Sequence, residues 1–347
     1  MKTLVLGGSV FVGRRLVELL VAGGHEVTVL NRGRTAVDLP DGVGRLVADR
    51  TDADAMATAL TGTNWDAVFD VSGFVMAAGG GDISTLLDLV DGSAGAYVYV
   101  SSIMAYDQSL VGPVEERPVP WTEDLPTNPS GAESYGGFKA TAEAALLARH
   151  ARTGFPATIL RPAAIYGPGN NIFDMETPMF LRLRRHLPIL LPHQGRVTGS
   201  YGHVDDLCAL MIRAATSGDA VGSVVNATTT AASAEQYVRV LAEVVGAEPD
   251  LVIVPAQDSG RQEDGSSGGP TWCHLFDARH HAVLDTGRAE QLLGDRPRFD
   301  LHDGHADTYD WFLRQGWGEL DHALVDPTWR ATWDFEAEAA LAEAIRS

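Results

Sequence analysis

The pattern of apolar and polar positions over residues 1–30 predicts a strand, a helix and a second strand. Residues 3–6 form a short apolar run, which a glycine turn follows. Val12, Leu16 and Leu20 then recur at helical spacing, and residues 26–30 form a second run of β type. A strand, turn, helix and strand of this length form a βαβ unit, whose crossover is almost always right-handed.

Further apolar runs alternate with helical patterns as far as residue 226. The expected strands span residues 45–47, 67–71, 97–100, 157–160 and 223–226, and the expected helices span residues 53–60, 86–90, 135–150 and 203–215. Near-continuous apolar strands that alternate with helices indicate a parallel sheet covered on both faces. We therefore predict an α/β fold with a doubly wound parallel Rossmann-type sheet.

The C-terminal part of the chain loses this regular alternation. Helical patterns at residues 179–185 and 234–245 and a short strand at 251–254 predict a smaller mixed α/β C-terminal substrate lobe. The expected dinucleotide-binding domain spans residues 1–168, with 196–228 returning to it. The expected substrate-binding lobe spans residues 169–195 and 229–347. An aromatic cluster in the tail, which includes Trp311, Trp317 and Phe335, has no role that the sequence assigns.

Composition and charge narrow the class of protein. The chain has 347 residues, of which 45% are hydrophobic, so it can build one large α/β domain and a smaller lobe. Its formal net charge of −20 argues against a nucleic-acid surface, because phosphate binding uses clustered Lys and Arg. A small-molecule substrate is therefore the expected partner, and a homodimer stays open.

Location and metal binding follow from similar arguments. No apolar run approaches the length of a membrane span, and the N-terminus enters a strand without a signal-peptide pattern. Only Cys208 and Cys273 occur, neither at metal-ligand spacing, which indicates a reducing, cytoplasmic setting. The histidines at 280, 281, 302 and 305 lack an organising carboxylate or cysteine pattern, so we expect no metal site.

The glycine turn after the first strand is a candidate anion site. Gly7 allows a sharp turn, and Gly13 allows the helix to lie close to the strand. The free N–H groups of the first helical turn then suit a pyrophosphate. The usual spacing places a third glycine where this chain has Val10, so a side chain is expected to meet the phosphates there.

A second constellation carries acid–base chemistry. Tyr135 and Lys139 lie at positions i and i+4, on one face of an expected helix. A lysine ammonium close to a phenol lowers the pKa of the tyrosine, which makes proton transfer near neutral pH feasible. Ser102 lies at a strand end, where ligands of such sheets bind, and its hydroxyl can contact a carbonyl or alcohol.

With these motifs in this order, the chain resembles the extended and atypical short-chain dehydrogenase/reductases, the NAD-dependent epimerase/dehydratase group. The resemblance is carried by the stretch 7–13, Asp49, the run 97–102 with Tyr106, the stretch 135–139, Arg161-Pro162 through residue 169, and the stretch 203–207. It implies that Ser102, Tyr135 and Lys139 form the catalytic set. It also implies that Asp49 contacts the adenine, and that Pro162 and the residues after it pass beside the nicotinamide.

The end of the second strand predicts which dinucleotide binds. NAD-selective enzymes place an Asp or Glu there, whereas this chain has Asn31-Arg32-Gly33-Arg34. Guanidinium groups suit a 2′-phosphate, so NADP is the expected cofactor and NAD the alternative. The full expected cofactor set is Gly7, Ser9, Val10, Phe11, Val12, Gly13, Asn31, Arg32, Arg34, Asp49, Arg50, Ser72, Gly73, Ser101, Pro162 and Ile165.

Departures from the resembled group bear on the substrate. Its dehydratases carry an Asp-Glu pair after the catalytic Ser/Thr, where this chain has Ile103-Met104. Ala164 and Gly199 replace Asn and Arg residues that typically contact a nucleotide diphosphate, and Arg182 or Arg196 would have to substitute. We therefore predict an NADP-dependent oxidoreductase that acts on a ketone or secondary alcohol smaller or more apolar than a nucleotide sugar. The alternatives are a nucleotide-sugar epimerase with recycled cofactor and a non-catalytic RNA-associated or regulatory homologue.

Overall fold

The computed structural model describes residues 1–34, 39–72, 83–107, 119–129, 133–170, 175–227, 230–255, 281–317 and 334–347. The chain forms two compact units. The first unit comprises Met1–Ile165, Val204–Thr229 and Leu284–Pro297, and the second comprises Tyr166–His203, Thr230–Val283 and Arg298–Ser347. These bounds differ from the expected division at residues 166–168 and 196–203, which belong to the second unit, and at 284–297, which belong to the first.

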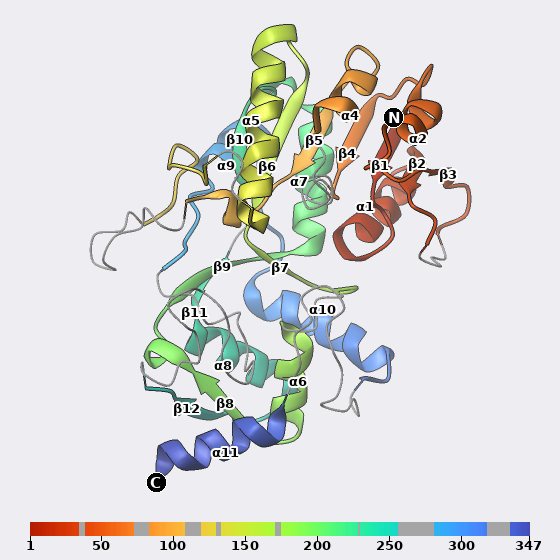
Figure 1. Ribbon diagram of the computed structural model, residues 1–347. Helices are drawn as coiled ribbons and strands as arrows, with labels where there is room; N and C mark the ends of the chain where they lie inside the picture. The colour runs from red at the N-terminus through yellow and green to blue at the C-terminus, as the bar shows by residue number, and fades with distance from the viewer. Residues whose placement is uncertain are drawn as a thin grey trace. The chain divides into compact units, whose positions relative to one another are not determined.

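A seven-stranded sheet in the order β10-β6-β5-β4-β1-β2-β3 forms the centre of the first unit (Figure 1). Its strands are β1 (Lys2–Leu6), β2 (Glu26–Asn31), β3 (Gly44–Val47), β4 (Ala67–Asp70), β5 (Tyr97–Val100), β6 (Ala157–Pro162) and β10 (Val224–Ala227). Every pair of neighbouring strands is parallel. The predicted parallel Rossmann-type sheet is confirmed, and all carboxyl ends of its strands lie along one edge.

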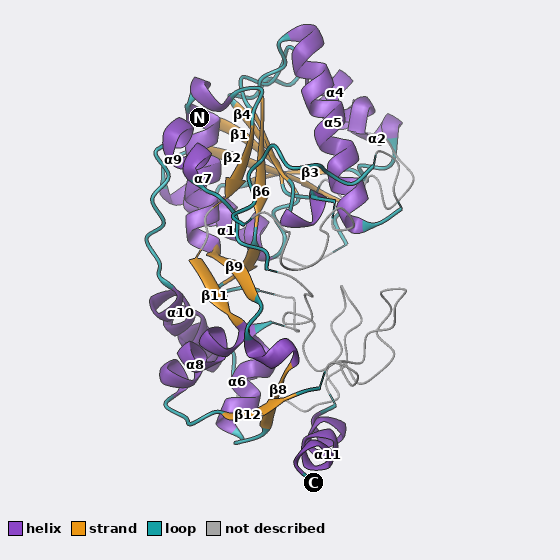
Figure 2. Cartoon of the chain, turned by 90° about the vertical axis from the view of Figure 1, so that its left-hand side faces the viewer, coloured by secondary structure: helices purple, strands orange, loops and turns teal. Residues whose placement is uncertain are grey.

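Helices cover both faces of this sheet. Figure 2 shows α1, α7 and α9 on one face and α2, α4 and α5 on the other. Their bounds are α1 (Phe11–Ala22), α2 (Ala53–Leu60), α4 (Ile83–Val90), α5 (Tyr135–Thr153), α7 (Val204–Thr216) and α9 (Gly287–Leu293). The sequence predicted these helices except α9, whose seven residues leave little room for a periodic pattern.

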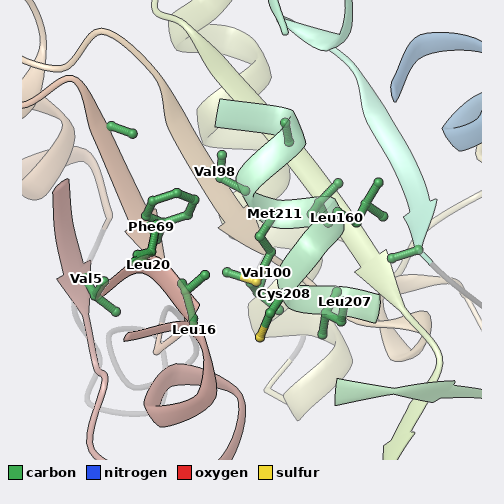
Figure 3. Close-up of a cluster of buried hydrophobic side chains, with 14 of the residues drawn as sticks. Val5, Leu16, Leu20, Phe69, Val98, Val100, Leu160, Leu207, Cys208 and Met211 are labelled. Carbon is green, nitrogen blue, oxygen red and sulfur yellow. The ribbon is translucent and has the colours of Figure 1, made fainter. Parts of the chain in front are cut away.

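The two faces have separate hydrophobic cores, and β5 shows why its sequence reads as continuously apolar. Val98 and Val100 enter the cluster beneath α1 and α7 (Figure 3). Tyr97 and Tyr99 point the other way, into the cluster beneath α4 and α5. Because successive strand side chains alternate between faces, a strand buried on both sides needs no polar positions.

The second unit is smaller and mixed. In it β9 (Thr198–His203) pairs antiparallel with β11 (Thr230–Ser233), and β8 (Pro188–Leu191) pairs parallel with β12 (Asp250–Ile253). Its helices are α6 (Glu176–Arg184), α8 (Ala234–Val245), α10 (Leu301–Arg314) and α11 (Phe335–Arg346). β7 (Ala164–Tyr166) ends at the boundary between the units.

The sequence missed several of these elements. It placed His203 inside a helix, whereas β9 ends at this residue and α7 begins at Val204. The short strands β7, β8, β9 and β11 were not predicted, because three to six residues with a mixed pattern give little periodic signal. Across the described ranges, no helix is both long and apolar enough to cross a membrane.

Candidate active site

The turn between β1 and α1 is built by close backbone packing. Gly7 and Gly8 have φ angles of +117° and +79°, in the region that favours glycine. A Cβ atom on Gly13 would lie 2.6 Å from the backbone nitrogen of Gly8. Because this contact is with the backbone, no movement of a side chain could relieve it. The first turn of α1 therefore lies directly against the glycine turn, as the spacing predicted.

The backbone at Val10 itself is unstrained. Val10 precedes α1 with φ −141° and ψ 154°, an extended conformation that any residue adopts, and its side chain is half exposed. The left-handed position is instead the buried Phe11, at φ +39°. The first turn of α1 holds no acidic residue and no side-chain cap. The partial positive charge at this helix start is thus left for an external anion.

A pocket of about 200 Å³ opens beside this helix start, wholly within the first unit. It is lined by Leu6, Gly7, Ser9, Val10, Leu30, Asn31, Arg32, Gly33, Arg34, Ala48, Arg50 and Ser72. Eight of the residues expected to bind cofactor are among them. Among the described residues, the lining contains three arginines and no carboxylate, although the whole chain carries a net charge of −20. This contrast fits an anionic ligand.

Asp49 lies beside the pocket but not in its lining. Its carboxylate accepts hydrogen bonds from the Thr51 hydroxyl at 2.8 Å and the Thr51 N–H at 3.1 Å. These bonds, with a smaller effect of the nearby Arg32 and Arg34 charges, lower the pKa of Asp49. The carboxylate thus stays ionised and fixed in a local turn. Its expected contact with adenine stays a prediction.

Arg50 lines the pocket, and its guanidinium is bound by Asp70 and Ser72. Nη1 and Nη2 donate to the two Asp70 carboxylate oxygens at 2.7 and 2.8 Å, and Nη1 also donates to the Ser72 hydroxyl at 2.7 Å. The Tyr97 hydroxyl donates to Asp70 at 2.8 Å. Burial alone would raise the pKa of Asp70, but the Arg50 charge and these hydrogen bonds outweigh it and lower that pKa. Arg50 and Ser72 of this hydrogen-bonded group form part of the pocket wall.

The expected catalytic residues meet where β5 ends. Ser102 precedes the short 3₁₀ turn η1 (Ile103–Ala105), and its hydroxyl accepts from the Met104 N–H at 3.1 Å. The Ser134 hydroxyl caps the start of α5 by accepting from Gly137 N–H at 3.0 Å. The side chains of Tyr135 and Ser102 are joined by a hydrogen bond. The structure therefore brings together two residues that lie 33 positions apart in sequence.

Gly136 makes this meeting sterically feasible. A Cβ atom at this position would collide with the Met104 carbonyl oxygen, because α5 starts directly against η1. The Asn128 side-chain amide donates to the same carbonyl at 2.8 Å and so also holds η1 in place. The sequence showed Gly136 only as a neighbour of Tyr135, and its packing role depends on a contact across 32 residues.

The pKa shifts of Tyr135 and Lys139 differ from the expectation. Burial raises the pKa of Tyr135, and only the hydrogen bond with Ser102 acts in the opposite direction. The Lys139 ammonium donates to the Val100 carbonyl at 2.6 Å and lies 5.6 Å from the centroid of the Tyr135 ring. Burial lowers the pKa of Lys139 to about 8, opposed by the charges of Asp70 and Glu143. The expected lysine-driven lowering of the tyrosine pKa is therefore not seen, because Nζ is directed at the backbone of β5.

Ser101 is part of an internal hydrogen-bond network, and its expected contact with the cofactor stays a prediction. Its hydroxyl donates to Glu143, which also forms a buried ion pair with Arg161 at 2.6 Å. This network ties α5 to β5 and β6. Glu143 carried no motif signal, although it lies one helical turn beyond Lys139 on the same buried face.

The remaining expected cofactor residues occupy different surroundings. Pro162 lies at the carboxyl end of β6, on the same sheet edge as the glycine turn. Phe11 belongs to the core beneath α1, and Val12 and Ile165 pack against that core. Gly73 lies outside the described residues. Pro162, Phe11, Val12 and Ile165 are not among the residues that line the pocket.

Arg182 has an internal partner in the second unit. Arg182, a suggested replacement for a diphosphate contact, is buried and pairs with Glu338 of α11 at 2.6 and 2.8 Å. It is therefore committed to an internal ion pair.

Of the histidines, His281 accepts from the Thr198 N–H at 3.0 Å and His305 is fully buried. Across the part of the chain that the structure describes, no histidine, cysteine and carboxylate cluster suits a metal ion.

Comparison with known proteins shows which family the chain belongs to. Residues 3–227 match the model of the NAD dependent epimerase/dehydratase family, and the chain belongs to this family. It is 26% identical over 338 residues to the chloroplast stem-loop binding protein of 41 kDa b of Arabidopsis thaliana, which covers 91% of this chain and 80% of that protein. It is 28% identical over 325 residues to 2′-dehydrokanamycin reductase of Streptomyces kanamyceticus, which covers 91% and 86%.

The fold has solved counterparts. DesIV, a dTDP-glucose 4,6-dehydratase from Streptomyces venezuelae solved with NAD bound, matches with a TM-score of 0.70 at 23% identity, over 92% of this chain and 99% of that one. The predicted family and the Rossmann-type fold are thus confirmed. The protein is an NAD(P)-dependent enzyme of the epimerase, dehydratase or reductase type.

Proposed function

We propose that the protein is an NADP(H)-dependent oxidoreductase that interconverts a ketone and a secondary alcohol. The observation that carries this proposal is the side-chain hydrogen bond between Tyr135 and Ser102, beside Lys139, at the sheet edge where ligands of this fold bind. A phenol and a hydroxyl held together in this way can contact the same substrate oxygen.

The choice of NADP(H) rests on the pocket beside the glycine turn. Arg32 and Arg34 lie in its lining at the end of β2, where an NAD-selective enzyme places a carboxylate. Guanidinium groups bind phosphate through charge and paired N–H donors. The glycine turn and the uncapped start of α1 suit the pyrophosphate of either dinucleotide.

The chemistry divides between the cofactor and this chain's own residues. When bound, the nicotinamide supplies or accepts a hydride. Tyr135 gives a proton to the carbonyl oxygen as it becomes an alcohol, and Ser102 holds that oxygen by a hydrogen bond. A raised pKa keeps Tyr135 protonated at neutral pH, which suits a donor in the reductive direction. Lys139 donates to the Val100 carbonyl and holds its charge 5.6 Å from the centroid of the Tyr135 ring.

The substrate we propose is small or apolar. Dehydratases of the family carry an Asp-Glu pair directly after the catalytic Ser/Thr, where this chain has Ile103-Met104. The Met104 side chain has an exposed fraction of 46%. Ala164 and Gly199 lack the side chains that would contact a nucleotide diphosphate. Because Arg182 is sequestered by Glu338, it does not replace them. The relative named as a reductase, 2′-dehydrokanamycin reductase, supports net reduction.

The test is a turnover assay with purified protein. We expect loss of NADPH absorbance with at least one member of a panel of small and apolar ketones, and a large decrease in rate for Tyr135→Phe. A nucleotide-sugar epimerase would instead retain its cofactor during purification and show saturable thermal stabilisation by UDP-, dTDP- or GDP-sugars without consuming NADPH. Either result would contradict the proposal.

A second candidate function has one observation in its favour, the similarity over 91% of the chain to a protein named for stem-loop binding. Such a role needs no turnover. Gel-shift titration with RNA stem-loops at two salt concentrations separates it from catalysis, because phosphate binding weakens steeply with salt. The net charge of −20 leads us to expect no shift.

A further inference from the structure

Arg45 reaches across from β3 to Asn31, a residue of the pocket lining, although its position in the sequence gives no sign of this. β3 pairs with β2 in a register that places Arg45 opposite Val29. Its guanidinium extends to the end of β2, where Nε and Nη2 donate to the Asn31 side-chain oxygen at 3.3 and 3.1 Å. Arg45 is exposed and therefore remains open to solvent beside the pocket.

The orientation of the Asn31 amide is fixed by its partners. One of its terminal atoms receives three N–H donors, two from Arg45 and one from the Gly33 backbone at 3.0 Å. Only an oxygen can accept all three. The opposite terminal atom is then the NH₂ group, which donates to the Ser9 hydroxyl at 3.1 Å. Ser9 and Asn31 both line the pocket.

This orientation has a chemical consequence for the ribose. An Asp or Glu at the end of β2 accepts a hydrogen bond from a ribose 2′-hydroxyl. Asn31 has its acceptor occupied by Arg45 and Gly33, so the amide offers donors toward Ser9 and the phosphate loop. Donors suit a phosphate, which at neutral pH accepts hydrogen bonds.

We propose that Arg45 is a positioning residue that determines selectivity for a 2′-phosphorylated dinucleotide. It holds Asn31 with its donors toward the pocket and adds a third guanidinium to those of Arg32 and Arg34. This inference rests on the proposed NADP(H) preference and extends it to a residue outside the pocket lining. The ligand chemistry is a 2′-phosphate on an adenosine ribose.

The experiment compares binding of 2′,5′-ADP with binding of 5′-ADP by isothermal titration calorimetry, without turnover. Arg45→Met removes the charge and both hydrogen bonds but keeps an unbranched side chain. It is expected to weaken 2′,5′-ADP binding about two- to fivefold, as for a solvent-exposed charge, and to leave 5′-ADP binding unchanged. Arg45→Lys keeps the charge and is expected to lose less. The matched control is Arg296→Met, an exposed arginine of the same unit that pairs with Glu290.

Asn31→Asp gives a second, independent measurement. A carboxylate at this position supplies an acceptor and repels phosphate, so we expect its affinity ratio to reverse in favour of 5′-ADP. If wild type binds 2′,5′-ADP no better than 5′-ADP, the NADP(H) preference and this inference both fail. If wild type prefers 2′,5′-ADP but Arg45→Met keeps the full ratio, or weakens both ligands equally, the role of Arg45 alone is overturned.

Discussion

Acid should destabilise the second unit through one buried histidine. His305 in α10 is fully buried, and its ring lies 4.1 Å from the ring of Tyr166 and 4.8 Å from that of Tyr237, centroid to centroid. Neither ring nitrogen has a hydrogen-bond partner among the described residues. Burial lowers the pKa of His305 well below its ordinary value, and the charges that His203 and His302 acquire on protonation lower it further.

The magnitude follows from linkage between proton binding and folding. In the unfolded chain the histidine has a pKa of about 6.5, whereas in the folded chain it stays neutral to much lower pH. As pH falls through about 6.5, the unfolded state alone takes up the proton, so stability is lost at up to about 1.4 kcal/mol per pH unit. Between about pH 7.5 and pH 5 this single group removes about 2 kcal/mol from the free energy of unfolding.

The assay isolates His305 by comparing variants. Urea unfolding at both pH values gives the pH-dependent loss of stability for wild type and for His305→Phe, which keeps an aromatic ring but cannot be protonated. We expect the variant to lose about 2 kcal/mol less than wild type, because all other titrating groups are common to both. His302→Gln, at an exposed position of the same helix, removes one of the two charges that act on His305 and should change the loss far less than His305→Phe does. Equal losses in wild type and His305→Phe would refute the reasoning.

Three further predictions concern the candidate active site. Tyr135→Phe should lower kcat about a hundred- to ten-thousand-fold with cofactor affinity nearly intact, whereas Lys139→Met should impair both turnover and cofactor binding; steady-state kinetics with a cofactor titration separate the two. Gly136→Ala should displace α5 from η1 and reduce turnover, measured as kcat, so unchanged kcat would exclude the close-packing argument. Glu143→Leu leaves Arg161 as a buried charge without its partner and should cost about 3–5 kcal/mol of stability, measured by urea unfolding.

The sequence predicted the parts of the fold that local patterns encode. The run 97–100 is apolar at every position because β5 is buried on both faces, and the glycine at 13 is required by a contact only five residues away. These signals depend on neighbours in the chain. The i, i+4 spacing likewise paired Tyr135 with Lys139, whereas Ser102 joined them only through the resemblance to a known family.

What the sequence missed depends on contacts between distant segments. The Arg45–Asn31 hydrogen bonds and the Glu143–Arg161 ion pair join residues on different elements, and no spacing rule relates them. The direction of the Tyr135 pKa shift was missed for a similar reason. It depends on burial and on the use of Lys139 by the backbone of β5, neither of which the i, i+4 spacing reveals.

The buried pair between Arg182 and Glu338 has a consequence for synthesis on the ribosome. Arg182 is made early, but the carboxylate that compensates its charge is made 156 residues later, in α11. Until that helix leaves the exit tunnel, burying the guanidinium in its native place leaves an uncompensated charge, at a cost of about 3–5 kcal/mol. Domains otherwise tend to fold in the order of their synthesis. The second unit must therefore complete its core after translation of α11, and a nascent chain stalled before residue 338 should remain open to proteolysis there.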